Sequence, residues 1–225
     1  MAGLPQRKSC ARIICDGGSL FRLNLTQKQV FRMKLILDVM NIYARIDQDV
    51  AVFQLKTGLR CPPGCGSCCS SKNIQVTVVE MLPAAHEILY RDEAAHYIQL
   101  IENGLEGCVF YKENCAPAPG HCDMYAARPA VCRLFGFSAA RDRLGAPKLA
   151  ACRHLKQTDP GAVLRACEHQ DSAPCFTHFE TPLAALDVQN RRLLPVNQAL
   201  YHAIMRLGLY LQIHHNETLG RSSAT

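Results

Sequence analysis

The stretch Cys61-Pro62-Pro63-Gly64-Cys65-Gly66-Ser67-Cys68-Cys69 places four thiols within nine residues. Its two glycines are expected to turn the backbone through positive φ, so that several sulfur atoms point at one centre. The two prolines stiffen the start of this turn. Cys65 and Cys68 have the spacing at which a knuckle-like turn delivers two thiolates to one metal ion. The stretch therefore favours a metal or cluster site over disulfide or redox use, because thiols packed in one turn are poorly placed to pair with each other.

Further cysteines follow in three short runs, which are Cys108-Val109-Phe110, Cys122-Asp123-Met124-Tyr125 and Arg128-Pro129-Ala130-Val131-Cys132-Arg133-Leu134-Phe135. Together with the first stretch they resemble the YkgJ-like cysteine-cluster family, whose domain is described as zinc- or iron-chelating. The family pattern is C-x-x-C-x-x-C-C, then C-x-F/L, C-x-I-Y and R-P-x-x-C-R. The resemblance covers about residues 61–152, with one departure: three residues, not two, separate Cys61 from Cys65.

The resemblance implies that thiolates from the whole region bind the metal. The expected ligands are the seven signature cysteines and one further cysteine at a position where the family often has another: Cys61, Cys65, Cys68, Cys69, Cys108, Cys122, Cys132 and Cys152. Thiolates are soft ligands that select zinc or iron–sulfur clusters over magnesium or calcium. Lys72 and Arg133 are close enough in sequence to offset the negative charge of such a centre. An ordinary surface ion pair would explain Arg133 equally well.

The adjacent pair Cys68-Cys69 favours more than one metal atom per chain. Successive side chains tend to point away from each other unless the chain turns sharply, so the two thiolates are expected to serve different metal atoms. The number of signature thiols also exceeds the four that one zinc ion accepts. Five cysteines lie outside the signature and receive no assigned role: Cys10, Cys15, Cys115, Cys167 and Cys175.

Composition limits the class of protein. With 225 residues, 48% of them hydrophobic, the chain can form one domain or a domain with helical extensions. The net charge of +6 comes from scattered Lys and Arg, so a nucleic-acid surface is not indicated. No apolar run has the length of a secretory signal or of a membrane span. We therefore expect a cytoplasmic protein without a membrane segment, in which reduced thiols are available for metals. The sequence leaves room for a protein partner but identifies none.

The pattern as a whole predicts a mainly α fold with small β elements, in which an irregular, cysteine-rich metal-binding domain is flanked by helices. The expected division is a weakly ordered segment 1–25, a helix 26–57, the cysteine-cluster domain 58–155, a helical extension 156–213 and a tail 214–225. Residues 104–133 show little periodicity, and a loop of that length needs a cross-linking reason. Metal ligation supplies one, because ligand bonds replace the missing hydrophobic burial.

Local signals refine this division. Capping boxes and apolar periodicity predict helices over residues 26–55, 77–103, 159–168 and 196–212. Gly104 is expected to stop the second of these helices. Short strands are predicted over residues 73–76, 134–139 and 148–151, the last two joined by a hairpin loop over 141–145. Pro174 and Pro182 are expected to flank a loop.

Three functions fit these residues. The first is a small metal-binding protein whose cysteine cluster holds zinc or iron and supports the fold. The second is an iron–sulfur cluster enzyme or an electron carrier, and the flagellin lysine methylases carry a similar cysteine pattern. The third is a scaffold in which the metal staples a protein-interaction surface.

Motifs of catalysis leave the question of an enzyme open. The sequence has no Gly-rich nucleotide loop, G-x-S-x-G elbow or H-E-x-x-H motif. The spacing of Cys61, Cys65 and Cys68 matches the C-x3-C-x-x-C motif of radical S-adenosylmethionine enzymes, but no barrel-like alternation of strands and helices follows. His86 and His96 are expected to be surface or packed histidines rather than ligands.

A test of the ligand set compares cysteines inside and outside the signature. Cys10→Ser, Cys15→Ser and Cys167→Ser should each leave the metal content unchanged, because these residues lie outside the motif. Cys65→Ser and Cys132→Ser should reduce the metal content, because both lie at its centre. Elemental analysis of the purified variants measures metal per chain. Loss of metal from Cys10→Ser would show instead that the N-terminal segment supplies a ligand.

Overall fold

The computed structural model describes residues 27–61, 65–66, 68–69, 71, 73–113 and 120–222, with side chains described between 33 and 209 within these ranges. Helices dominate and the strands are short, so the predicted fold class is confirmed. Several predictions fall outside the described residues: those for segment 1–25 with Cys10 and Cys15, for the cap at Thr26, and for Gly64, Lys72 and Cys115.

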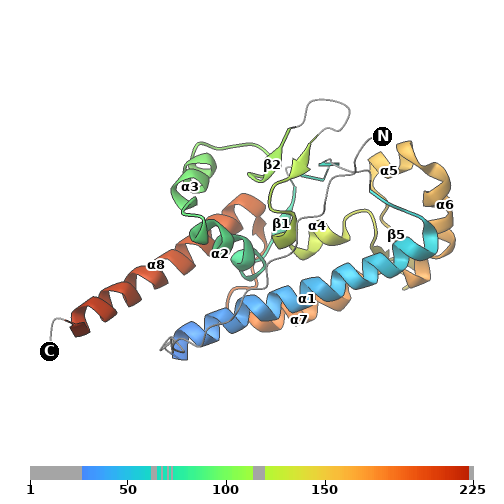
Figure 1. The fold of residues 1–225 in the computed structure, drawn as a ribbon. Helices are drawn as coiled ribbons and strands as arrows, with labels where there is room; N and C mark the ends of the chain where they lie inside the picture. Colours follow the sequence, from blue (N-terminus) through green and yellow to red (C-terminus); the bar gives the residue numbers. More distant parts are fainter. Residues whose placement is uncertain are drawn as a thin grey trace, which may run out of the picture.

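A long helix, α1 (Gln27–Thr57), runs along one side of the molecule, as predicted (Figure 1). Buried side chains along its middle recur at three- and four-residue steps: Val39, Tyr43, Ile46, Val50 and Phe53. The helix ends where the Thr57 hydroxyl donates to the Phe53 carbonyl at 2.8 Å and accepts from the Leu59 amide at 3.2 Å. Gly58 then reverses the chain at a φ of 73°, a conformation that favours glycine.

The single helix predicted over 77–103 is wrong, because the structure has two. A 3₁₀ turn, η1 (Val79–Met81), leads into α2 (Leu82–Tyr90), and α3 (Ala94–Glu102) follows after a break. The break falls in the charged run Arg91-Asp92-Glu93, where Asp92 has a φ of 58°. Aspartate tolerates this left-handed conformation better than most residues, and the run offers no apolar side chain to bury. Gly104 ends α3 with a φ of 72°, as predicted.

Three short antiparallel strand pairs join distant or consecutive segments. They are β1 (Gln75–Val76) with β6 (Leu194–Pro195), β2 (Tyr111–Lys112) with β3 (His121–Cys122), and β4 (Ala139–Arg141) with β5 (Pro147–Leu149). The β4–β5 pair is the predicted hairpin. Its first strand begins at Ala139 rather than at Leu134, because Leu134 is the last residue of helix α4 (Ala130–Leu134).

The C-terminal half holds more helix than predicted. Helix α6 (Pro160–Glu168) is the predicted one, preceded by α5 (Arg153–Thr158) and followed by a 3₁₀ turn, η3 (Gln170–Ser172). Helix α7 (Phe176–Leu186) replaces the predicted loop and contains Pro182. A proline inside a helix removes one hydrogen bond, and the burial of Phe179 and Leu183 offsets that loss. Helix α8 (Val196–Ser222) continues past Gln212 and includes most of the predicted tail.

Residues 104–113 and 120–133, the described parts of the predicted loop 104–133, are more ordered than expected for a loop that only a metal holds. They contain β2, β3, a 3₁₀ turn η2 (Tyr125–Ala127) and most of α4. Val109, Phe110 and Met124 lie in the same buried core as α1 and α8. Hydrophobic burial therefore supports this segment as well, and the core is continuous along the described chain. None of the helices in the described part has the length and apolar character needed to cross a membrane.

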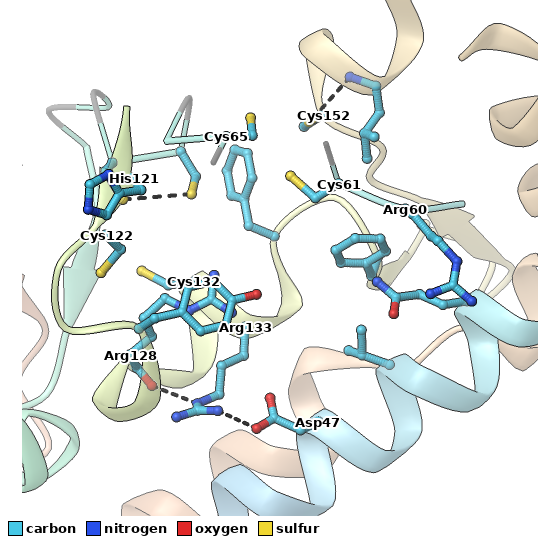
Figure 2. A pocket seen from close by; sticks show the side chains of 18 residues that line it. Asp47, Arg60, Cys61, Cys65, His121, Cys122, Arg128, Cys132, Arg133 and Cys152 are labelled. Atoms are coloured by element: carbon cyan, nitrogen blue, oxygen red, sulfur yellow. Dashed lines mark hydrogen bonds and ion pairs between the residues drawn. The ribbon is translucent and has the colours of Figure 1, made fainter. Parts of the chain in front are cut away.

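Arg133 joins three elements at the centre of the fold. Only 4% of its side chain is exposed, so the interpretation as a surface pair is wrong. Its Nε donates to the Arg128 carbonyl at 2.7 Å, and its two terminal nitrogens bind Asp47 on α1 and the Ala126 carbonyl in η2 (Figure 2). The guanidinium also lies 4.5 Å from the ring centroid of Tyr43. Arg133 thus holds α4 and η2 against α1.

The substitution Arg133→Gln tests this junction. It should lower the free energy of unfolding by about 3 kcal/mol, because it leaves two carbonyls and a carboxylate without their donor. Urea unfolding followed by circular dichroism measures the change. Arg91→Gln is the matched control, since Arg91 pairs with Glu87 on an exposed helix face, and it should leave the unfolding midpoint unchanged. Equal effects of the two substitutions would contradict the assignment.

Candidate metal centre

Seven of the eight expected ligands line a single cavity of about 800 Å³ (Figure 2). They are Cys61, Cys65, Cys68, Cys69, Cys122, Cys132 and Cys152. The first four come from the opening stretch, and the others from β3, from α4 and from the residue before α5. The eighth, Cys108, is buried behind this wall, and its amide donates to the Cys69 carbonyl at 3.2 Å. The fold thus gathers thiols that are far apart in sequence.

Two glycines allow the opening stretch to approach the β2–β3 hairpin. Cys65 and Gly120 form a parallel bridge. A Cβ atom on Gly66 would lie 2.6 Å from the Tyr111 ring, and one on Gly120 would lie 2.4 Å from the Lys112 carbonyl. Gly120 also has a φ of 140°, whereas Gly66 does not lie in the positive region. The prediction that Gly66 turns through positive φ is therefore wrong, and close backbone approach is what requires glycine there.

The thiols of Cys68 and Cys69 point to the same side. Their sulfur atoms are 4.0 Å apart, close to the roughly 3.8 Å between two sulfurs of a tetrahedral zinc site. The chain turns sharply here, because the Cys69 amide donates to the Gly66 carbonyl at 2.8 Å. The geometric reason for assigning the pair to different metal atoms is therefore wrong. Only the number of thiols still favours more than one metal atom.

The thiols form two groups within the cavity region. We call Cys61, Cys65 and Cys152 the outer thiols, which Figure 2 shows together on one side. The inner thiols are Cys68, Cys69, Cys108, Cys122 and Cys132. Burial raises the pKa of Cys61 to about 12, and the neighbouring Cys65 thiol and then Cys152 add to this rise. Among the inner thiols, Cys122 and Cys68 contribute to the raised pKa of Cys108.

Comparison with known families now assigns part of the chain. Residues 60–168 match the family "CxxCxxCC: Putative zinc- or iron-chelating domain". The match covers slightly less than half of the chain, and this segment is similar to that family. The resemblance to the YkgJ-like cluster is confirmed, and the match extends it past Cys152 to the end of α6. No curated protein and no solved structure matches the chain.

Hydrogen bonds among the inner thiols favour the deprotonated form of two of them, Cys68 and Cys122. A bond with the Cys69 thiol lowers the pKa of Cys68 to about 6 and also lowers the pKa of Cys122. The pKa of Cys69 is raised, because its thiol bonds to the Cys122 and Cys68 thiols and is buried. Burial raises the pKa of Cys132. The thiolate is the form of cysteine that binds metals, and Cys68 and Cys122 are the two thiols whose pKa is lowered here.

Arg128, rather than Arg133, brings positive charge to these thiolates. Its charge contributes to the lowered pKa values of Cys68 and Cys122. Its guanidinium carbon lies 3.5 Å from the ring centroid of Tyr125. Arg133 is committed to its own three partners, and Lys72 lies outside the described residues. The sequence contained a signal for this role, because Arg128 opens the R-P-x-x-C-R run one helical turn before Cys132.

Other residues take places that sequence analysis did not assign. His121 on β3 and Asp47 on α1 line the cavity, and neither was singled out. Cys167 is exposed, whereas the buried Cys175 sulfur lies 3.1 Å from the Thr177 hydroxyl, and neither lines the cavity. His96 packs edge-on against the Tyr97 ring, with centroids 5.4 Å apart. His86 lines a smaller second cavity of about 330 Å³ between α1 and α2.

The chemistry of the donor set fits a thiophilic metal ion. Its arrangement is open: in the described part of the chain, no three Cys, His, Asp or Glu side chains surround one point closely enough to hold an ion. Binding a metal would therefore draw the thiols together, which couples metal binding to local ordering.

Gly120→Ala tests the close approach that brings the opening stretch to β3. The added Cβ would collide with the Lys112 carbonyl, so the hairpin should move away from Cys65 and the domain should bind less metal. We expect thermal unfolding to show a smaller zinc-dependent rise in Tm than in the unaltered protein. Gly161→Ala is the control, because its nearest neighbour would be 3.7 Å away. A full zinc-dependent rise in Gly120→Ala would count against the role of this glycine.

Proposed function

We propose that the protein chelates zinc or iron through the thiolates of its CxxCxxCC domain. The observation that carries the proposal is the meeting of cysteines from separate stretches in one cavity. The proposed ligands are Cys61, Cys65, Cys68, Cys69, Cys108, Cys122, Cys132 and Cys152. The family description supports binding of zinc or iron. We place this chemistry in the cytoplasm, where thiols stay reduced.

Cys69, Arg128 and Arg133 would each help to hold such a centre in a different way. Cys69 stabilises the thiolates of Cys68 and Cys122 by hydrogen bonding. Arg128 offsets their negative charge. Arg133 fixes α4, and with it Cys132, against α1. A bound metal would supply cross-links between the opening stretch, β3, α4 and the start of α5, in addition to the hydrophobic core.

A second candidate is an iron–sulfur centre, as in an electron carrier or a cluster enzyme. The number of inner and outer thiols favours it, because a tetrahedral zinc ion takes only four ligands. Cysteine thiolates hold the common iron–sulfur clusters as sets of four. Eight ligands therefore suit two metal centres or one polynuclear cluster with additional thiols around it.

Anaerobic purification with elemental analysis and a visible absorption spectrum decides between these candidates. A colourless protein that contains zinc supports simple chelation, whereas a brown protein that contains iron and sulfide supports the cluster. Cys65→Ser removes an outer thiol and Cys132→Ser an inner one. With two centres, each substitution should remove only part of the metal, while Cys167→Ser should remove none.

One outcome would contradict the proposal, and another would contradict the presence of two centres. A protein that contains no metal after anaerobic purification, and binds neither zinc nor iron on reconstitution, is not a chelator. A single metal atom per chain, lost completely and equally in Cys65→Ser and Cys132→Ser, would rule out two centres.

A further inference from the structure

The cavity is much larger than a metal ion requires. An ion bound at about 2.3 Å from its sulfur atoms fills only the space between those atoms. The cavity has a volume of about 800 Å³, which is within the range of pockets for small organic molecules. The thiols form only part of its wall. The rest of the wall includes residues of α1, of the turns after α1 and α4, and of α5: Asp47, Val50, Gln54, Arg60, Phe135, Phe137 and Leu155.

One polar atom in this wall has no acceptor. The Nε of Arg128 is buried and has no hydrogen-bond partner among the described residues. A buried donor without an acceptor is costly, and such groups normally have a partner. The Tyr125 ring, 3.5 Å from the guanidinium carbon, supports one face of the group and leaves its edge for an acceptor. The planar edge of a guanidinium suits the two oxygens of a carboxylate or a phosphate.

Aromatic, aliphatic and cationic side chains make up much of the rest of the wall. Phe137 and Leu155 are buried there, and Phe135 is 43% exposed. Arg60, in the turn after α1, adds a second guanidinium. The carboxylate of Asp47 is paired with Arg133, so it does not balance the charge of Arg60. An anionic molecule with an apolar body fits this combination of charge and aromatic surface.

We propose that the cavity binds a small organic anion, whose carboxylate or phosphate group accepts hydrogen bonds from Arg128 while its apolar body packs against Phe135 and Phe137. The anion lies beside the thiols, so it shares the cavity with the proposed metal centre. The proposal goes beyond metal chelation and does not depend on which metal is bound.

Isothermal titration of the full-length protein, as purified, tests the proposal. The probes are phenyl phosphate and benzoate, which distinguish phosphate from carboxylate, and inorganic phosphate, which lacks the apolar body. At least one aromatic probe should bind more tightly than inorganic phosphate. Arg128→Gln should weaken that binding about tenfold or more, the cost of losing a charge-assisted hydrogen bond. Phe135→Ala should weaken the binding of the aromatic probe by about threefold and leave the binding of inorganic phosphate unchanged.

Controls separate this proposal from metal chelation and from misfolding. Arg141→Gln removes an exposed arginine on the β4–β5 hairpin and should change nothing. Metal content and thermal unfolding are measured on the same samples, so loss of metal and loss of anion binding are seen separately. Absence of binding by both aromatic probes would overturn the proposal. So would an Arg128→Gln variant that loses metal but keeps full affinity for the probe, because the guanidinium would then serve the thiolates alone.

Discussion

The buried guanidinium of Arg133 connects the helical frame to the cysteine-bearing segments. It binds the Asp47 carboxylate on α1, the Ala126 carbonyl in η2 and the Arg128 carbonyl. These carbonyls lie at the end of an irregular segment, where no helix or sheet supplies them with donors. A neutral side chain could not satisfy all three acceptors at once. The position of α4, and therefore of Cys132 in the cavity wall, depends on this charged group.

A second constraint acts through steric exclusion. The opening stretch and the β2–β3 hairpin approach so closely at Gly66 and Gly120 that a Cβ atom on either would collide with its neighbours. This approach pairs Cys65 with Gly120, the residue before strand β3, which carries Cys122. Arg133 and the two glycines thus act on different parts of the same cavity. Together they explain why thiols distant in sequence share one wall without a disulfide among the described cysteines.

The electrostatics of the cavity follow from this gathering. Thiols brought close together resist ionising at the same time, so one remains protonated and bonds to its neighbours. Cys69 takes that part, and Cys68 and Cys122 become the more acidic pair. Arg128 adds a positive charge that is not used in holding the fold. Of the two arginines in the R-P-x-x-C-R run, Arg133 holds the fold together and Arg128 faces the ligands of the cavity.

The sequence by itself determined the fold class, the long first helix, the β4–β5 hairpin and the cysteine-cluster family. Each rests on local signals, namely periodicity, turn residues and cysteine spacing, which need no knowledge of distant contacts. Only the tertiary structure decided that Arg133 is buried, that Arg128 faces the thiols, and that Gly66 is required by close approach. It also decided that a helix forms around Pro182, because burial of Phe179 and Leu183 outweighs local propensity. These outcomes depend on which segments pack together, and neighbouring residues in the sequence carry no record of that.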